Sequence, residues 1–266
     1  MRRSRPFQDY EAFLVDIDGV LVRGTTPIEG ASRGLEALRQ RGRCLFLTNN
    51  SSRSRHRLSE RLASLGFGTT PDDVVPSSYI AAQHLLALEG EISFWLLAEE
   101  LRLAGHRACT RPEEADWVVA GIDRHVSYDR LADALRALRS GARLLATNDD
   151  PTFPAVDGPL PGAGAIVGAL AGMGFPAEIV VGKPSPIAFR VALERLDVDP
   201  ASVLMIGDRL ETDIRGAASA GLASALVLTG VTDRSQLADG DARPTWIAES
   251  LSDLAAGHAE AASRPT

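Results

Sequence analysis

The 266-residue sequence has little cysteine, little lysine and few aromatic side chains. It contains two cysteines, one lysine among 28 cationic residues, and 5% aromatic residues. Cys44 and Cys109 cannot form the disulfide framework of a small secreted protein, and Cys44 lies in an apolar run that is typical of a buried strand. The basic residues 1–6 are followed by no apolar stretch of signal-peptide length. We therefore expect a protein of a reducing compartment, the cytoplasm.

An excess of positive charge is also lacking. The 28 basic and 35 acidic side chains give a formal net charge of −7. A nucleic-acid-binding protein usually presents a basic surface to the phosphates, so this composition argues against a nucleic-acid partner. The apolar content of 45% and the charged content of 24% are those of an ordinary soluble globular protein.

No apolar segment suits a membrane. The longest window without an ionisable side chain, residues 158–177, has small residues at Gly164, Gly168 and Gly172, a spacing known from membrane helices. The same window contains six glycines and three prolines, so its transfer into lipid would be poor. A glycine-rich loop that leads into a close-packed helix is the better interpretation.

Short aliphatic runs alternate with amphipathic stretches along the whole chain. The predicted strands are 12–16, 43–47, 92–97, 117–120, 143–146, 179–181, 203–206 and 225–228. The predicted helices are 31–41, 54–65, 79–88, 128–139, 164–173, 187–196 and 212–220. Nearly continuous apolar strands between helices are typical of parallel sheets covered on both faces, so we expect an α/β protein.

Four of the predicted strands end in polar residues, where ligands bind in such sheets. The four strand ends are Asp16-Ile17-Asp18-Gly19, Thr48-Asn49-Asn50-Ser51-Ser52, Gly182-Lys183-Pro184 and Gly207-Asp208-Arg209-Leu210-Glu211-Thr212-Asp213. About 130 residues separate the second from the third, which is far more than an ordinary connection. We therefore predict an inserted domain, residues 82–177, in a core formed by residues 1–81 and 178–266.

The carboxylates at these strand ends require compensation. Asp16 and Asp18 are two residues apart, so their side chains point to the same side of the strand. Asp208 and Asp213 would bring four carboxylates together, and these repel unless a cation or a proton separates them. A magnesium ion suits a site of two or three carboxylates, and Lys183 would add a further positive charge. Lys183 is the only lysine of the chain. Codon usage that favours arginine explains this as well as a site that needs a compact ammonium group instead of a forked guanidinium group.

The insertion contains a second Thr-Asn pair after a predicted strand, Thr147-Asn148-Asp149-Asp150, which resembles Thr48-Asn49. Either pair could supply a hydroxyl and an amide to an anion. A duplicated structural turn is favoured over a second anion site, because Asp149 and Asp150 make this loop acidic.

Each motif alone is compatible with a polar turn. Polar turns do not explain the four motifs together, in this order and each at the end of a strand. Together they resemble the haloacid dehalogenase-like superfamily of phosphohydrolases, whose pattern is Asp-x-Asp-Gly, then Thr or Ser, then Lys, then Gly-Asp-x-x-x-[Thr/Ser]-Asp. More narrowly, the sequence is similar to the NagD-type and 4-nitrophenylphosphatase-like enzymes of subfamily IIA. Further segments typical of that subgroup are Ala146-Thr147-Asn148 with Asp150, Pro161-Gly162-Ala163-Gly164, Gly182-Lys183-Pro184-Ser185-Pro186 and Arg243-Pro244-Thr245-Trp246-Ile247. The likeness extends from about residue 13 to residue 247 without a departure at a catalytic position.

The resemblance implies a Rossmann-like, doubly wound parallel-sheet core with a large inserted α/β cap. It implies a Mg²⁺-dependent phosphatase that hydrolyses a small phosphate monoester through an aspartyl-phosphate. Asp16 would be the nucleophile, and Asp18 the general acid and then the base. Thr48 and the backbone amide of Asn49 would bind the transferring oxygens, and Lys183 would pair with both Asp16 and the phosphoryl group.

The resemblance also implies the metal ligands. These would be the Asp16 carboxylate, the Asp18 backbone carbonyl and Asp208, with Asp213 a direct or water-mediated ligand. In such enzymes the cap selects the leaving group, so Asn148, Asp149, Asp150 and the segment 151–158 are candidates for substrate specificity.

The sequence leaves several questions open. The arginine-rich start of the helix after the second motif, including Arg53, also favours an anionic substrate. Nothing chooses among sugar phosphates, glycerol phosphate, phosphoglycolate, pyridoxal phosphate, nucleotides and aryl phosphates. The oligomeric state is equally open, although related caps often form homodimers.

Three other functions remain as alternatives. A phospho-receiver signalling module also gathers acidic residues, Thr or Ser and Lys, but receivers are shorter and lack an acid/base such as Asp18. An interaction protein could retain the motifs without turnover. A hydrolytic dehalogenase of the same superfamily needs no metal, and the presence of both Asp18 and Asp208 argues against it.

Overall fold

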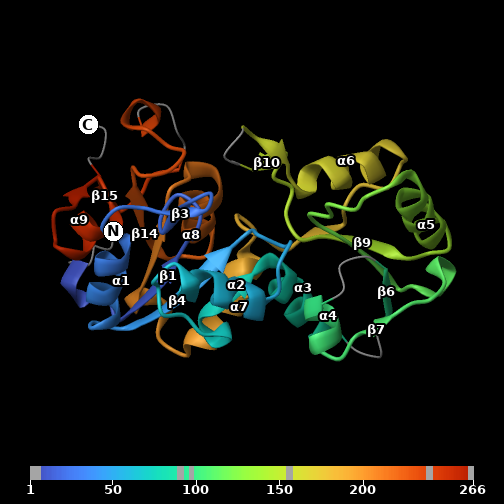
Figure 1. Ribbon diagram of the computed structural model, residues 1–266, viewed down its shortest axis with the longest axis horizontal. Helices are drawn as coiled ribbons and strands as arrows, with labels where there is room; N and C mark the ends of the chain where they lie inside the picture. Colours follow the sequence, from blue (N-terminus) through green and yellow to red (C-terminus); the bar gives the residue numbers. More distant parts are fainter. Residues whose placement is uncertain (1–6, 89–92, 96–98, 154–157, 238–241, 263–266) are drawn as a thin grey trace. The chain divides into compact units, whose positions relative to one another are not determined.

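A computed structural model describes residues 7–88, 93–95, 99–153, 158–237 and 242–262 (Figure 1). The chain forms two compact units. The first unit consists of Met1–Thr48, Ser59–Val75 and Lys183–Thr266, and the second of Asn49–Leu58 and Pro76–Gly182. The predicted insertion, residues 82–177, falls within the second unit.

The first unit is built on a sheet that has seven strands within the described residues, in the order β16-β15-β14-β13-β1-β4-β5. Strand β1 pairs in parallel with β13 on one side and β4 on the other, and only the edge pair β15 and β16 is antiparallel among the registers observed. All four residues of β1 are buried, as a central strand requires. The strands are β1 (Ala12–Val15), β4 (Arg43–Thr48), β5 (Val74–Pro76), β13 (Val203–Gly207), β14 (Ala223–Val227), β15 (Trp246–Ala248) and β16 (Glu260–Ala261).

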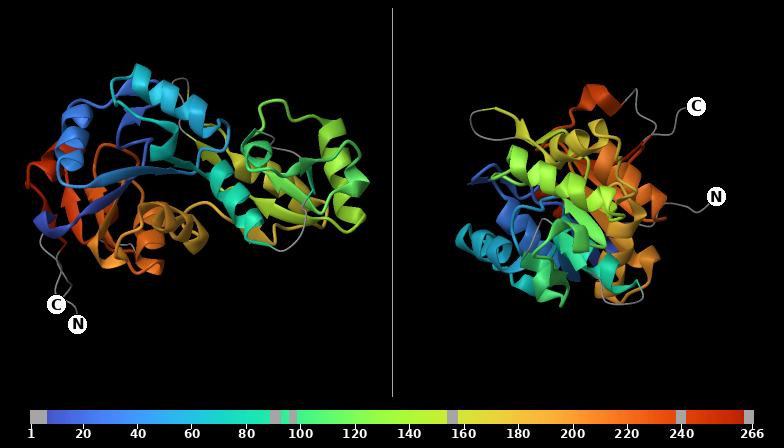
Figure 2. Two further views of the ribbon diagram at one scale, coloured as in Figure 1. Left: turned by 90° about the horizontal axis from the view of Figure 1, so that it is seen from below. Right: turned by 90° about the vertical axis from the view of Figure 1, so that its right-hand side faces the viewer.

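Helices cover both faces of this sheet. Helix α1 packs against α9, and α7 packs against α8; Figure 2 shows α1 and α7 on opposite sides of the strands. Ser185 caps α7 by accepting the backbone N–H of Ile187, and Pro186 occupies the first turn. The helices are α1 (Ala31–Arg39), α2 (Arg55–Ser64), α7 (Pro186–Leu196), α8 (Arg215–Ser219) and α9 (Leu251–Ala255), with short helical turns η1 (Phe7–Asp9), η2 (Pro71–Asp73), η4 (Pro200–Ser202), η5 (Leu210–Ile214) and η6 (Arg234–Leu237), and a hairpin β2 (Val22–Arg23) and β3 (Thr26–Pro27).

The second unit contains a parallel sheet with five strands in its described part, in the order β12-β9-β8-β6-β7. Helices α5 and α6 pack together over β8, and their apolar faces close a core around Val118, Leu138, Leu144 and Leu170. The elements are α3 (Ser77–Leu86), β6 (Ser93–Trp95), α4 (Glu99–Leu103), β7 (Arg107–Ala108), η3 (Pro112–Glu114), β8 (Trp117–Ala120), α5 (Tyr128–Arg139), β9 (Arg143–Ala146), the hairpin β10 (Thr152–Phe153) and β11 (Leu160–Pro161), α6 (Ala163–Gly172) and β12 (Ile179–Val180).

The predicted α/β class with parallel sheets is confirmed. The strands predicted at 117–120 and 143–146 and the helix at 128–139 have the bounds observed. The predicted helix at 212–220 is instead a π turn, η5, followed by the short α8. Of the predicted strand 92–97, residues 93–95 are observed, and residues 92, 96 and 97 lie outside the described part. The short elements β5, β7, β15, β16, α4 and α9 were not predicted, because segments of two to five residues carry too little periodicity.

The uncharged window 158–177 forms β11 and the 10-residue helix α6. Among the described residues, no helix has both the length and the apolar character needed to span a bilayer.

Candidate active site

Three neighbouring strands of the first unit end at the same edge of its sheet. Val15, the last residue of β1, is in register with Ile206 of β13 and with Phe46 of β4. Because all three strands are parallel, the residues that follow them emerge together. Asp16, Asp208 and Thr48 therefore gather at one edge, although up to 192 positions separate them in the sequence.

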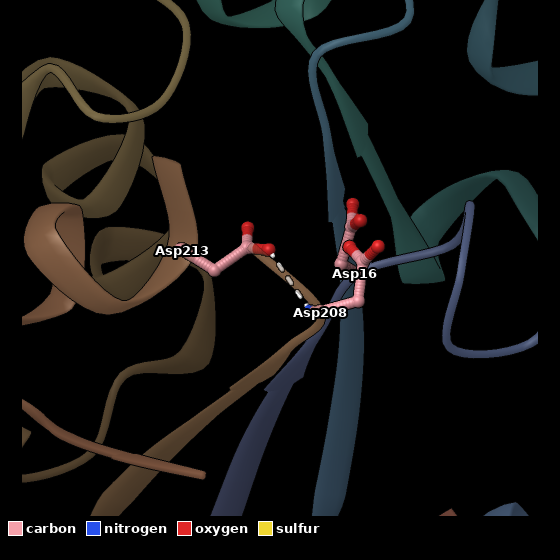
Figure 3. A group of neighbouring side chains, drawn as sticks. All are labelled: Asp16, Asp208 and Asp213. Carbon is pink, nitrogen blue, oxygen red and sulfur yellow. Dashed lines mark hydrogen bonds between the residues drawn. The ribbon is translucent and has the colours of Figure 1, made fainter. Parts of the chain in front are cut away.

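An acidic cluster lies at this edge. A carboxylate oxygen from each of Asp16, Asp208 and Asp213 lies within 4.8 Å of the other two, and the three residues are 7%, 1% and 0% exposed. Figure 3 shows the carboxylates of Asp16 and Asp208 beside each other and that of Asp213 turned toward the backbone of Asp208. The Asp213 Oδ2 accepts hydrogen bonds from the backbone N–H groups of Asp208, at 3.2 Å, and Arg209, at 3.1 Å.

Lys183 lies within this cluster and is 2% exposed. Its Nζ donates to Asp16 Oδ1 at 2.7 Å and to Asp213 Oδ1 at 2.6 Å. Burial alone would lower the pKa of Lys183, but the two carboxylates more than offset this effect, and its pKa is raised. With all three carboxylates ionised, the cluster would carry a net charge of −2 in spite of the ammonium group.

Burial is the main cause of the raised pKa values in this cluster, and the neighbouring carboxylates add to it. Burial raises the pKa of Asp16 well above its usual value, Lys183 opposes the shift, and Asp213 and Asp208 add to it. Burial, followed by the charge of Asp213, raises the pKa of Asp208 to about 7, against the lowering effect of the Val231 N–H. In the absence of a further cation, protons would therefore compensate part of the charge.

The donor set fits a hard divalent cation. The Asp208 Oδ1 is buried and has no hydrogen-bond partner within the part of the chain that the structure describes. Both oxygens of Asp213, by contrast, already accept hydrogen bonds from the protein. Carboxylate oxygens in a negatively charged site are ligands that Mg²⁺ and Ca²⁺ prefer. Asp16 and Asp208 are thus the better placed direct ligands, and Asp213 is better suited to act through water.

Asp18 occupies the turn after β1 and is half-buried. Burial raises its pKa, while the nearby positive charges of Arg61, Lys183 and Arg209 act in the opposite direction. A raised pKa favours the protonated carboxyl group that a general acid needs. The turn continues with Gly19, whose φ of 90° lies in the left-handed region.

Thr48 and Asn49 are neighbours in sequence but belong to different units. Thr48 is buried at the end of β4 in the first unit, and Asn49 begins the second. In the second unit Asn49 is held by several hydrogen bonds. Its Nδ2 donates to Asp150 Oδ2 at 2.9 Å, and its carbonyl accepts from Asn148 Nδ2 at 2.7 Å and from Ser77 Oγ at 2.8 Å. The second Thr-Asn turn thus packs on the first.

The specificity candidates have different environments. Asn148 is buried, Asp150 is half-buried, and Asp149 is exposed. Asp149 is therefore the most exposed of the three. Residues 154–157 of the candidate segment 151–158 lie outside the described residues.

Two features of the site were not predicted from the sequence. The first is Ser77, which contacts the Asn49 carbonyl. The second is the loop Thr229-Gly230-Val231-Thr232, which follows β14 and donates a backbone N–H to Asp208. The sequence does contain a pattern that indicates this loop as part of the site. The strand predicted at 225–228 is followed by a polar residue and a glycine, as at the other strand ends. Only the order of the strands shows that β14 lies beside β13.

Comparison with known proteins shows the family of this chain. Residues 13–104 match the family model described as haloacid dehalogenase-like hydrolase, and residues 180–254 match a related HAD-hydrolase-like model. The 5′-nucleotidase YutF of Bacillus subtilis is 36% identical over 92% of this chain and 97% of its own. A p-nitrophenyl phosphatase from Archaeoglobus fulgidus has a TM-score of 0.87 at 36% identity, over 93% of this chain and 99% of that one. The glycerol phosphate phosphatase of Mycobacterium tuberculosis, solved in complex with magnesium, has a TM-score of 0.87 at 37% identity, over 95% of this chain and 78% of that one.

The chain therefore belongs to the haloacid dehalogenase-like hydrolases. Within them it is a phosphatase of the NagD and 4-nitrophenylphosphatase type, a phosphoric monoester hydrolase. The predicted family is confirmed, and the phosphatase is favoured over the receiver and dehalogenase alternatives.

Proposed function

We propose that this protein is a Mg²⁺-dependent phosphatase that hydrolyses a small phosphate monoester through an aspartyl-phosphate on Asp16. The observation that carries the proposal is the buried contact of Asp16 with the only lysine of the chain, beside the carboxylates of Asp208 and Asp213. Phosphoryl transfer depends mainly on positioning and on charge stabilisation, and this cluster provides both.

Asp16 and Asp208 would hold the metal ion, with the Asp18 backbone carbonyl as a further ligand and Asp213 acting through water. A bound Mg²⁺ would neutralise the charge of the cluster and of the phosphoryl oxygens. The magnesium complex of the mycobacterial glycerol phosphate phosphatase supports this choice of metal.

In the first step, an Asp16 carboxylate oxygen forms a bond to phosphorus, and the bond between phosphorus and the ester oxygen breaks. Lys183 orients Asp16 through its hydrogen bond to Oδ1. Asp18 gives its proton to the leaving oxygen, so that the alcohol leaves neutral. Its raised pKa supports this role, because a larger share of the carboxyl group is protonated near neutral pH.

In the second step, the ionised Asp18 takes a proton from a water molecule, which attacks the aspartyl-phosphate. The bond between phosphorus and Asp16 breaks, inorganic phosphate is released, and Asp18 is again protonated. Thr48 and the backbone N–H of Asn49 would bind the phosphoryl oxygens in both steps.

We further propose that residues 82–177 act as a cap that selects the leaving group. The related enzymes named above act on nucleotides, on glycerol phosphate and on an aryl phosphate, so the fold accommodates different alcohols. Asp149 is the best candidate for contact with hydroxyl groups of a sugar or glycerol moiety, because it is the most exposed of the three specificity candidates. Asn148 and Asp150 would influence specificity indirectly, because both form hydrogen bonds with Asn49. Both cysteines are free thiols, which supports a cytoplasmic location.

The test is turnover of p-nitrophenyl phosphate by the full chain, with Mg²⁺ and with EDTA. We expect hydrolysis that EDTA abolishes and that added Mg²⁺ restores. A panel of sugar phosphates, glycerol 3-phosphate and nucleoside monophosphates, assayed for phosphate release, then ranks the leaving groups. Activity that is indifferent to chelation would refute the metal, and a lack of turnover on every ester would refute the function.

A further inference from the structure

The loop that follows β14 encloses the Asp208 side chain. The backbone N–H of Val231 donates to Asp208 Oδ2 at 2.8 Å, and that of Thr232 donates to the Asp208 carbonyl at 3.2 Å. Asp208 is therefore bound by this loop through both its side chain and its backbone. The loop contributes no carboxylate of its own to the cluster.

Glycine is required where the loop approaches. A Cβ atom on Gly230 would overlap the carboxylate and the Cβ of Asp208, and a Cβ on Gly19 would overlap the same carboxylate. The Asp208 side chain thus lies between two backbone segments that approach closely only because neither has a side chain. A methyl group on either glycine would displace the carboxylate.

The two segments are also joined to each other. Thr229 Oγ1 donates to the Gly19 carbonyl at 2.6 Å, and an Arg23 guanidinium N–H donates to the Thr229 carbonyl at 2.7 Å. The loop is therefore tied to the turn that carries Asp18. This connection fixes the distance between the Asp18 turn and the loop around Asp208.

The two oxygens of the Asp208 carboxylate therefore have different environments. One Asp208 oxygen is held by the Val231 N–H, while the other, Oδ1, has no hydrogen-bond partner among the described residues. Groups that orient a metal-binding carboxylate through its second oxygen influence metal affinity strongly. We propose that Thr229 and Gly230 are positioning residues that orient Asp208 for a divalent cation. This inference rests on the proposed function, because it assumes that Asp208 binds the metal.

The first test is Gly230→Ala, with the affinity for Mg²⁺ alone measured by isothermal titration calorimetry on the full chain. We expect the affinity to fall by about tenfold to a hundredfold, the range for loss of an orienting partner. Gly168→Ala is the matched control, because a Cβ at this exposed position in α6 would meet no atom within 4 Å. It should bind Mg²⁺ as the wild type does.

The second test does not depend on Gly230→Ala being folded. Thr229→Val removes the hydroxyl group that donates to Gly19 while keeping the shape of the side chain, and Thr229→Ser keeps the hydroxyl. We expect the valine variant to bind Mg²⁺ several times more weakly and the serine variant to restore most of the affinity. In turnover assays the Mg²⁺ concentration for half activation should rise, with kcat largely recovered at saturating Mg²⁺. Circular dichroism and the melting temperature in EDTA check the fold.

The outcomes separate the two proposals. A wild-type protein that neither binds Mg²⁺ nor hydrolyses phosphate esters refutes the proposed function. A wild type that does both, together with wild-type Mg²⁺ affinity in folded Gly230→Ala and Thr229→Val, refutes only the positioning role. Equal losses in the valine and serine variants would also refute it, because the hydroxyl group would then not matter.

Discussion

The side-chain amide of Asn148 donates a hydrogen bond to the backbone carbonyl of Asn49 at 2.7 Å. The two residues belong to turns of similar sequence, Thr48-Asn49 and Thr147-Asn148, that are 99 positions apart. The second turn thus supports Asn49 of the first, and Asp150 and Ser77 also form hydrogen bonds with Asn49. This arrangement agrees with the interpretation of the second Thr-Asn pair as a structural turn.

The first prediction concerns the hydrogen bond between Asp150 and the Asn49 side chain. Asp150→Ala removes the acceptor of the Asn49 amide, and we expect the KM for p-nitrophenyl phosphate to rise roughly three- to tenfold, the worth of a net hydrogen bond. Because Asp150 would act through the Asn49 side chain, the double variant Asn49→Ala/Asp150→Ala should be no worse than Asn49→Ala alone. Asp129→Ala, which removes an exposed carboxylate of α5, is the control. Additive losses in the double variant would contradict the coupling.

The second prediction concerns the nucleophile. Asp16→Asn keeps the size of the side chain but replaces the carboxylate with an amide, which is a poor nucleophile. We expect kcat to fall by at least about a thousandfold, which corresponds to about 4 kcal/mol in the barrier. Phosphate release measures the loss, and circular dichroism verifies the fold. Residual activity near that of the wild type would place the nucleophile elsewhere.

The third prediction concerns the general acid. Asp18→Asn should reduce kcat/KM for glycerol 3-phosphate more than for p-nitrophenyl phosphate, because nitrophenolate leaves without being protonated. General acids contribute about 10²- to 10⁴-fold, so the alkyl ester should lose close to this amount. Mass spectrometry of the quenched variant should also detect a phosphorylated Asp16, because hydrolysis of the intermediate lacks its base. Equal losses for both esters would argue against protonation of the leaving group by Asp18.

The fourth prediction concerns pH and metal together. The pKa of Asp208 is raised to about 7 and that of Asp16 is also raised, whereas the pKa of an aspartate in the unfolded chain is about 3.9. Between about pH 4 and pH 7, the metal-free folded protein therefore holds protons that the unfolded chain has released. These groups stabilise the fold at low pH, and their contribution is lost as the pH rises through this window.

Mg²⁺ competes with the same protons, so it should raise the melting temperature more at pH 8 than at pH 5. Calorimetry with and without saturating Mg²⁺ measures the two increments. The Asp208→Asn variant is the control, and its increments should be smaller and less dependent on pH. A larger increment at pH 5 would contradict the proton competition.

The sequence alone determined the class of the fold and the motifs of the site. Strands such as 117–120 and helices such as 128–139 are local patterns of apolar residues, so periodicity reveals them. The polar ends of the strands at Asp16, Thr48 and Asp208 are equally local. The π turn before α8 and the short strands β5 and β15 are too short for periodicity to reveal, and β5 and β15 are identified by their pairing in the sheet.

The tertiary structure alone decided how these groups meet. The order β14-β13-β1-β4 brings the strand ends together, and no local pattern encodes which strands are neighbours. Packing also made Lys183 bridge Asp16 and Asp213, placed Gly230 against Asp208, and set Asn148 on Asn49. These contacts join residues far apart in sequence, and each depends on the distance and direction of single atoms, which the fold fixes and composition does not.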